Sequence, residues 1–265
     1  MKVAIEVITP RQAEAYLAAN VGNRPVLRAV VARYAREMAA GNWLLTHQGI
    51  AFDSQGKLVD GQHRLMAIIE AGRAVQMVVT RDIHVGVQIA MDDHAKRNAS
   101  ASLTIAAGET ITPWAVSTVR AATELCQARG PKATKIELRK QVEAFDRPLR
   151  FLEAYRPWNH KKVGSSCVCG AIAASWFYVP DLGKLGKFCE IMFGLCNIVL
   201  PHEQAALAMR ETMLRDGTSL AGGPRITLYC KTQRAIQAFQ DGEQLKKIYN
   251  NGPLYTWPLV NPVRT

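Results

Sequence analysis

The sequence predicts an α+β protein, a small mixed-sheet domain followed by an all-α domain. Up to about residue 105, short alternating or β-branched apolar runs are separated by helical segments. From about residue 112 onward, apolar residues recur at helical spacing, and Pro or Gly separates most of the helices. We therefore expect two domains, at 1–108 and 109–265.

The first domain is expected to open with an alternating strand. Thr9 and Pro10 follow it at the N-cap and N1 positions that begin a helix, and a second helix ends at Gly41. A hairpin, a helix ended by Gly72 and a strand rich in β-branched residues, expected to be buried, come next. The expected strands are 3–8, 49–53, 57–60 and 74–83, and the expected helices are 10–20, 26–40, 62–71 and 85–92.

The second domain is expected to be helical almost throughout. The segment SSCVCGAIAASWFYV is rich in small residues, which predicts a buried helix. The Pro-rich end of the chain predicts an irregular tail packed through Tyr255 and Trp257. The expected helices are 113–128, 134–154, 164–178, 182–197, 202–214 and 224–239.

Charge gives the first indication of function. The 265 residues are 48% hydrophobic and carry a net charge of +11, which favours polyanionic partners such as nucleic acid, nucleotides or anionic lipid. The alternative is charge that serves only solubility. The start of the chain does not resemble a signal peptide, no apolar run is long enough to span a bilayer, and the six cysteines are scattered. These features predict a cytoplasmic protein with reduced thiols and no membrane contact.

A polar box, DGQHR at 60–64, lies where a strand meets a helix. The first backbone N–H groups of a helix lack intrahelical acceptors, and Gly61 lets a ligand approach them closely. His63 and Arg64 add side-chain donors, so the box predicts a phosphate site. Alternatively, Asp60 caps the helix, Gly61 turns the chain and Arg64 pairs with a carboxylate. The residues alone leave both interpretations open.

With its flanking elements, the box resembles the ParB/sulfiredoxin superfamily, whose members bind nucleoside triphosphates in a small α/β domain. ParB proteins carry G-E-R-R where this chain has Gly61 to Arg64, and sulfiredoxin carries G-G-C-H-R from Asp60 to Arg64. The string itself is similar to that of DGQHR-domain proteins, which accompany DNA-modification systems. The resemblance covers about the first 105 residues. Gln62 stands where sulfiredoxin has its catalytic cysteine, which excludes thiol-based repair of sulfinic acids.

The resemblance implies a nucleoside triphosphate, ATP or CTP, bound with Mg²⁺. DDHAKR is the nearest counterpart of a later ParB motif, E-N-x-x-R, and makes Asp92 or Asp93 the expected Mg²⁺ ligand. Glu6 or Asp93 would act as the catalytic carboxylate on water or an acceptor hydroxyl. Solvated charges at a helix end, and an exposed position for Glu6, are the alternatives. The expected nucleotide-binding residues are Arg24, Asp60, Gly61, Gln62, His63, Arg64 and Arg97.

Basic clusters in the second domain, such as KATKIELRK and NHKK, predict contacts to DNA phosphates. Solvated helix faces on a basic protein are the alternative. The expected DNA-binding residues are Lys132, Lys135, Arg139, Lys140, Lys161 and Lys162.

Together these features predict a DNA-associated nucleotide-binding protein, and the resemblance to DGQHR-domain proteins implies a DNA-modification, phage or mobile-element setting. If it is an enzyme, the expected activity is that of a Mg²⁺-dependent NTPase or phosphotransferase. One alternative is a non-catalytic DNA-binding partition factor or transcriptional regulator. Another is a kinase-like enzyme acting on a modified nucleotide or a small hydroxyl compound. The sequence leaves a homodimer open.

Overall fold

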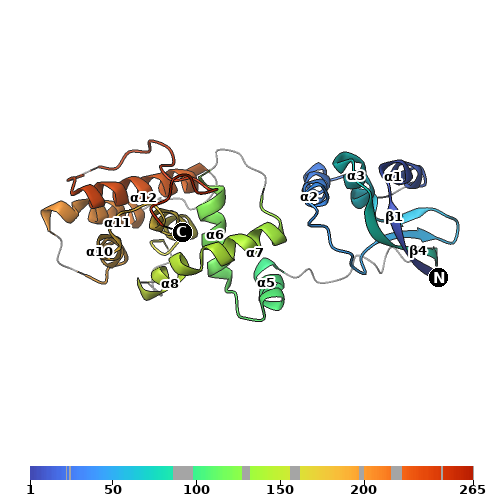
Figure 1. The fold of residues 1–265 in the computed structure, drawn as a ribbon. Helices are drawn as coiled ribbons and strands as arrows, with labels where there is room; N and C mark the ends of the chain where they lie inside the picture. Colours follow the sequence, from blue (N-terminus) through green and yellow to red (C-terminus); the bar gives the residue numbers. More distant parts are fainter. Residues whose placement is uncertain are drawn as a thin grey trace. The chain divides into compact units, whose positions relative to one another are not determined.

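The computed structural model describes residues 1–21, 23, 25–85, 98–126, 132–155, 162–196, 200–215, 223–245 and 247–264. Contacts divide the chain into two compact units, Met1–Lys96 and Arg97–Thr265 (Figure 1). The first contains a small mixed sheet with helices, and the described part of the second is helical. The predicted α+β class is confirmed.

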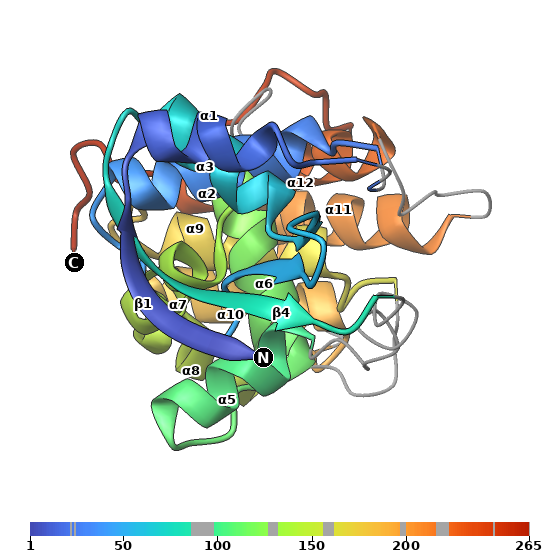
Figure 2. The same ribbon diagram turned by 90° about the vertical axis from the view of Figure 1, so that its right-hand side faces the viewer.

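One sheet organises the first unit. Within the described residues its strand order is β1 (Lys2–Ile8), β4 (Val75–Ile83), β2 (Ile50–Asp53) and β3 (Leu58–Asp60). β4 pairs antiparallel with β1 and parallel with β2, and β2 and β3 form the predicted antiparallel hairpin. Figure 2 shows the long β1–β4 pair.

Three helices, α1 (Pro10–Leu17), α2 (Arg28–Ala39) and α3 (Gln62–Ala71), lie on the same side of this sheet (Figure 1). Thr9 caps α1 as predicted, because its hydroxyl accepts a hydrogen bond from the backbone N–H of Gln12. The core of the unit forms between the helices and the sheet, around residues such as Ile8, Leu65 and Val79.

The opposite face of the sheet carries exposed apolar side chains, among them Val3, Ile5 and Val7 of β1. β4 shows the same alternation, with Met77 and Val79 buried and the residues beside them only partly buried or exposed. The expectation that β4 is a buried strand therefore holds for only one of its faces. A run of β-branched residues does not distinguish a strand covered on two sides from one covered on a single side.

The second unit is built around α9 (Ser166–Trp176). Every residue of α9 from Cys167 to Trp176 is buried, and α9 packs against α6, α8 and α12, which confirms the predicted buried helix. Trp257 packs on Phe145, and Tyr255 stacks on Tyr178, so the predicted packing of the tail is confirmed. The remaining described helices are α5 (Ala99–Ala107), α6 (Pro113–Glu124), α7 (Lys135–Ala144), α8 (Asp146–Tyr155), α10 (Leu182–Phe193), η1 (Pro201–Glu203), α11 (Gln204–Leu214) and α12 (Gly223–Asp241).

The single helix expected at 134–154 is two helices, α7 and α8, separated at Phe145. Pro148 accounts for the break, because proline has no N–H to donate and its ring clashes with the carbonyl four residues earlier. A Pro is tolerated in the first turn, so α8 begins afresh at Asp146. The buried Phe145 side chain packs against Phe177 and Trp257.

Helix α5 was not expected. Asn98 caps it by accepting a hydrogen bond from the N–H of Ala101, and left-handed Gly108 ends it. α5 packs against α6 and α7, and its Leu103 belongs to the helical core. For that reason contacts end the first unit at Lys96 instead of at the expected residue 108. The helix expected at 85–92 lies, apart from its first residue, outside the described residues.

Among the described residues, no helix combines the length and apolar character that crossing a membrane requires.

Candidate phosphate site at the start of α3

Gly61 joins β3 to α3 in a conformation that favours glycine. Its φ of 105° and ψ of 1° lie in the left-handed region, and it is the N-cap of α3. A Cβ at this position would lie 3.1 Å from both Cα and Cγ1 of Ile50. The strand therefore passes into the helix through one residue that has no side chain. The absence of a side chain lets the turn pack closely against Ile50 of β2.

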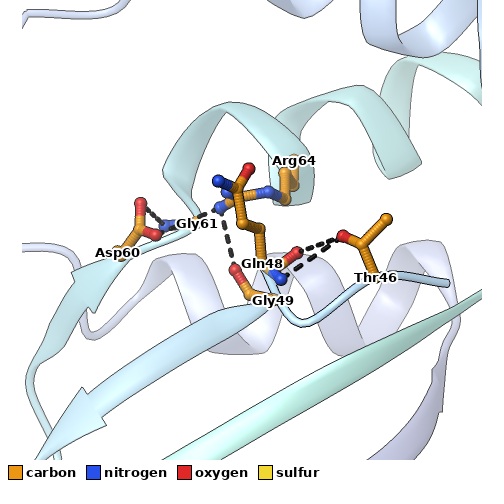
Figure 3. Close-up of polar contacts among 6 residues, drawn as sticks. All are labelled: Thr46, Gln48, Gly49, Asp60, Gly61 and Arg64. Carbon is orange, nitrogen blue, oxygen red and sulfur yellow. Dashed lines mark hydrogen bonds and ion pairs between the residues drawn. The ribbon is translucent and has the colours of Figure 1, made fainter. Parts of the chain in front are cut away.

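Arg64 lies in that first turn and is fixed by two hydrogen bonds (Figure 3). Its Nη1 donates to the carbonyl oxygen of Gly49, 2.8 Å away, and to Oδ2 of Asp60, 3.3 Å away. No other acceptor among the described residues contacts the guanidinium, whose side chain is 15% exposed. Arg64, which we expect to bind phosphate, is thus a positioned cation with N–H donors that these contacts do not use.

Asp60 contacts both Gly61 and Arg64. Its Oδ1 accepts a hydrogen bond from the N–H of Gly61 at 2.7 Å, and its Oδ2 faces Arg64. These contacts match the alternative interpretation of the box, in which Asp60 caps the turn and pairs with Arg64. Because the Asp60 side chain remains 42% exposed, its carboxylate also faces any anion that approaches the turn.

Gln62 and His63 are buried, and their side chains bind the protein itself. The amide of Asn20 donates to Oε1 of Gln62 at 3.1 Å, and the N–H of Leu27 donates to Nε2 of His63 at 3.0 Å. Nε2 therefore accepts, which assigns the imidazole proton to Nδ1. These contacts tie the box to the connection between α1 and α2, and the expected phosphate binding by both side chains stays a prediction.

The same connection is bound to β3 by a second set of contacts. The Asn23 amide donates to the carbonyl of Leu58 at 2.7 Å, and the Leu58 N–H donates to the carbonyl of Ala19 at 2.9 Å. Sequence reasoning missed Asn20, which also accepts a hydrogen bond from Asn23. Its position just after α1, near the NRP turn, was the only signal available. Arg24 lies in this connection but outside the described residues.

Glu6, expected to act as a catalytic carboxylate, forms an ion pair with Arg81. Both carboxylate oxygens contact Arg81, and Oε2 also accepts a hydrogen bond from the Tyr16 hydroxyl at 2.7 Å. Hydrogen bonding to Arg81, assisted by Tyr16, holds the pKa of Glu6 below its usual range despite partial burial. A carboxylate so engaged is a poor proton acceptor, so Glu6 is a structural ion pair that joins β1, α1 and β4.

The expected metal ligands Asp92 and Asp93, and the expected phosphate ligand Arg97, lie outside the described residues. Within the part of the chain that the structure describes, no three His, Cys, Asp or Glu side chains form a group that could hold a metal ion.

The expected DNA-binding residues have diverse surroundings. Lys135 donates to the Ser102 hydroxyl, Arg139 pairs with Glu143, and Lys162 donates to the carbonyl of Arg215. Lys140 is exposed on α7, and Lys132 lies just before that helix. Because α7 also carries Glu137 and Glu143, it is a mixed-charge helix and not a uniformly basic one. Lys161 lies outside the described residues.

Comparison with family models, with curated proteins and with solved structures finds no match to this chain.

Proposed function

We propose that the first unit binds the phosphates of a nucleoside triphosphate, ATP or CTP, at the start of α3, and that the protein works on or beside DNA. One observation carries the nucleotide proposal. Arg64 is held in the first turn of α3, directly after a left-handed glycine, with donor capacity that its contacts to Gly49 and Asp60 do not use. An N-terminal helix turn with a fixed guanidinium is suited to bind phosphate oxygens.

Asp60 makes this site depend on a divalent cation. Its exposed carboxylate would repel a bare triphosphate, and it partly neutralises Arg64 across 3.3 Å. Mg²⁺ prefers carboxylate and phosphate oxygens, so a cation between Asp60 and the phosphates would convert this repulsion into attraction. We therefore expect nucleotide to bind with Mg²⁺ and to bind far more weakly without it.

The association with DNA is supported by charge. Most of the excess of Lys and Arg over Asp and Glu falls after residue 96, in the helical unit. Such an excess favours binding to a polyanion through phosphate contacts that do not depend on base sequence. If nucleotide is turned over, the carboxylate nearest the phosphates would be Asp60, or Asp93 as the resemblance to ParB implies.

Calorimetric titration of ATP, CTP and GTP tests the nucleotide site. The titrations would be made with Mg²⁺ and with EDTA, with and without duplex DNA, using wild type, Arg64→Ala, Arg64→Lys and Arg73→Gln. Arg73 is the matched control, because it is an exposed arginine just beyond α3 that donates only to the carbonyl of Ala39 among described residues. Thermal melting of each variant checks that it is folded.

We expect one nucleotide to bind wild type and Arg73→Gln equally. Arg64→Ala should weaken binding about tenfold or more, as loss of a charge-assisted hydrogen bond does. Arg64→Lys should fall between them, since an ammonium keeps the charge without the planar fork of donors. Equal binding by Arg64→Ala and wild type, or no binding of any nucleotide even with DNA present, would overturn the proposal. Turnover assays on the nucleotide that binds would then separate an enzyme from a switch.

A further inference from the structure

A cavity of about 470 Å³ lies in the helical unit, and none of its lining residues belongs to the first unit. Its described lining comes from the start of α5, one face of α6, the segment before α7 and the first turn of α12. This volume lies within the range of small-molecule sites in proteins. The polar residues that line it include Asn98, Ser100, Arg120, Glu124, Lys132 and Arg225.

Arg120 is the most informative of these residues. Its Nε is buried yet donates to no acceptor among the described residues, and none of them forms an ion pair with its guanidinium. Glu124 lies one helical turn further along α6, at the spacing of a helical ion pair, but the two do not pair. A buried donor without an acceptor costs free energy, and a ligand in the adjoining cavity could supply that acceptor.

The charges around the cavity select an anion. Arg120, Lys132 and Arg225 oppose the single carboxylate of Glu124. Arg225 donates one hydrogen bond to the Ser166 hydroxyl, which positions its planar group. The N-terminus of α5 at Asn98 adds the partial positive charge of its backbone N–H groups. Phosphate, with several acceptor oxygens, matches this set better than a single carboxylate does.

Glu124 and the apolar part of the wall define the rest of the ligand. A carboxylate accepts hydrogen bonds from hydroxyl groups and repels a second phosphate. Val116 and Ala121 contribute apolar surface on the α6 side. We propose that this cavity binds a small phosphorylated sugar, a class that includes nucleoside monophosphates, with its phosphate on Arg120 and Arg225 and a sugar hydroxyl on Glu124.

Titration of the full-length protein with ribose 5-phosphate, deoxyadenosine 5′-monophosphate, inorganic phosphate and a short DNA duplex tests this site. The variants are Arg120→Gln, Arg225→Gln, Glu124→Gln and, as matched control, Arg150→Gln. Arg150 is an exposed arginine of α8 that pairs with Asp146 outside the cavity. Arg120→Lys is a second variant at the central position, and thermal melting establishes that each protein is folded.

We expect a sugar phosphate to bind wild type and Arg150→Gln equally and more tightly than inorganic phosphate. Arg120→Gln and Arg225→Gln should each raise the dissociation constant about tenfold or more. Glu124→Gln should reduce the preference for the sugar phosphate over inorganic phosphate. The proposal is overturned if no phosphorylated sugar binds, or if Arg120→Gln binds it like wild type. It is also overturned if Arg120→Gln weakens only duplex DNA, because the cavity would then hold a backbone phosphate.

Discussion

At the scale of single residues, Glu6 shows how one ion pair connects three elements. It accepts hydrogen bonds from Arg81 of β4 and Tyr16 of α1, while lying on β1 itself. The Arg81 guanidinium also lies over the rings of Tyr16 and Phe52, at 5.7 Å from each centroid. Because the partners come from distant parts of the chain, the cluster fixes how α1 and the β1–β4 pair fit together.

The lowered pKa of Glu6 makes this cluster sensitive to acid. The folded state binds the Glu6 proton less readily than the unfolded chain, for which the usual pKa is near 4.5. The stability that ionised Glu6 contributes to the folded state is therefore complete above pH 4.5, and it is lost as the pH falls through the lower pKa of Glu6 in the folded state. We expect Glu6→Gln to reduce the free energy of unfolding of the first unit, by on the order of 1 kcal/mol, near neutral pH and by less in acid.

Urea unfolding of wild type and Glu6→Gln between about pH 7 and pH 3 measures this difference. Glu14→Gln is the control, because Glu14 is exposed on α1 and its side chain forms no hydrogen bond or ion pair with another described residue. A constant difference between wild type and Glu6→Gln across this pH range would mean that the ion pair contributes nothing through its charge.

At the scale of elements, Gly61 determines whether α3 can begin directly after β3. Alanine at this position would have to adopt a φ of 105°, and its Cβ would approach Ile50 at 3.1 Å. We expect Gly61→Ala to destabilise the first unit by about 2–4 kcal/mol, from backbone strain and crowding together. Gly72, at the other end of α3, also has positive φ but open space around it. Gly72→Ala should cost only roughly 1–2 kcal/mol.

Chemical denaturation of the two alanine variants tests the comparison within one helix. A similar loss of unfolding free energy in Gly61→Ala and Gly72→Ala would show that only the positive φ, and not the crowding by Ile50, matters at Gly61. A loss confined to Gly72→Ala would contradict the geometry of the turn.

Local signals predicted most of the elements. Thr9 and Pro10 marked the start of α1, and the hairpin and the glycine-ended helices followed from turn chemistry. The break between α7 and α8 was equally local, because Pro148 required it, but the apolar periodicity across Phe145 hid it. Sheet order and the side of the sheet that the helices cover depend on contacts between distant segments, and the sequence does not encode those contacts in a local pattern.

The candidate site was predictable only in part for the same reason. The strand–turn–helix context indicated the turn at Gly61 and the position of Arg64 in the first helical turn. The partners of Gln62 and His63, by contrast, are 42 and 36 residues away along the chain. No spacing rule connects Asn20 or the N–H of Leu27 with the box, so the residue types suggested ligand binding and gave no sign of these internal contacts.

At the scale of the whole molecule, the two units have separate hydrophobic cores. One core contains Leu65 and Val79 of the first unit, and the other contains Ile172 and Phe188 of the second. No buried residue belongs to both clusters. Most of the net positive charge belongs to the helical unit, whereas the candidate nucleotide site belongs to the first. The proposed nucleotide site and the proposed DNA contacts thus belong to units with separate cores.

Separate cores predict that the two units unfold in separate transitions. Leu65 is fully buried in the first core, so Leu65→Ala should lower the stability of that unit by about 2–5 kcal/mol and leave the second transition unchanged. Ile172→Ala, at a fully buried position of α9, should do the reverse. Differential scanning calorimetry of the full-length protein resolves both effects. If each variant shifts a single common transition, the units unfold as one cooperative body, and a ligand bound to either would then stabilise both.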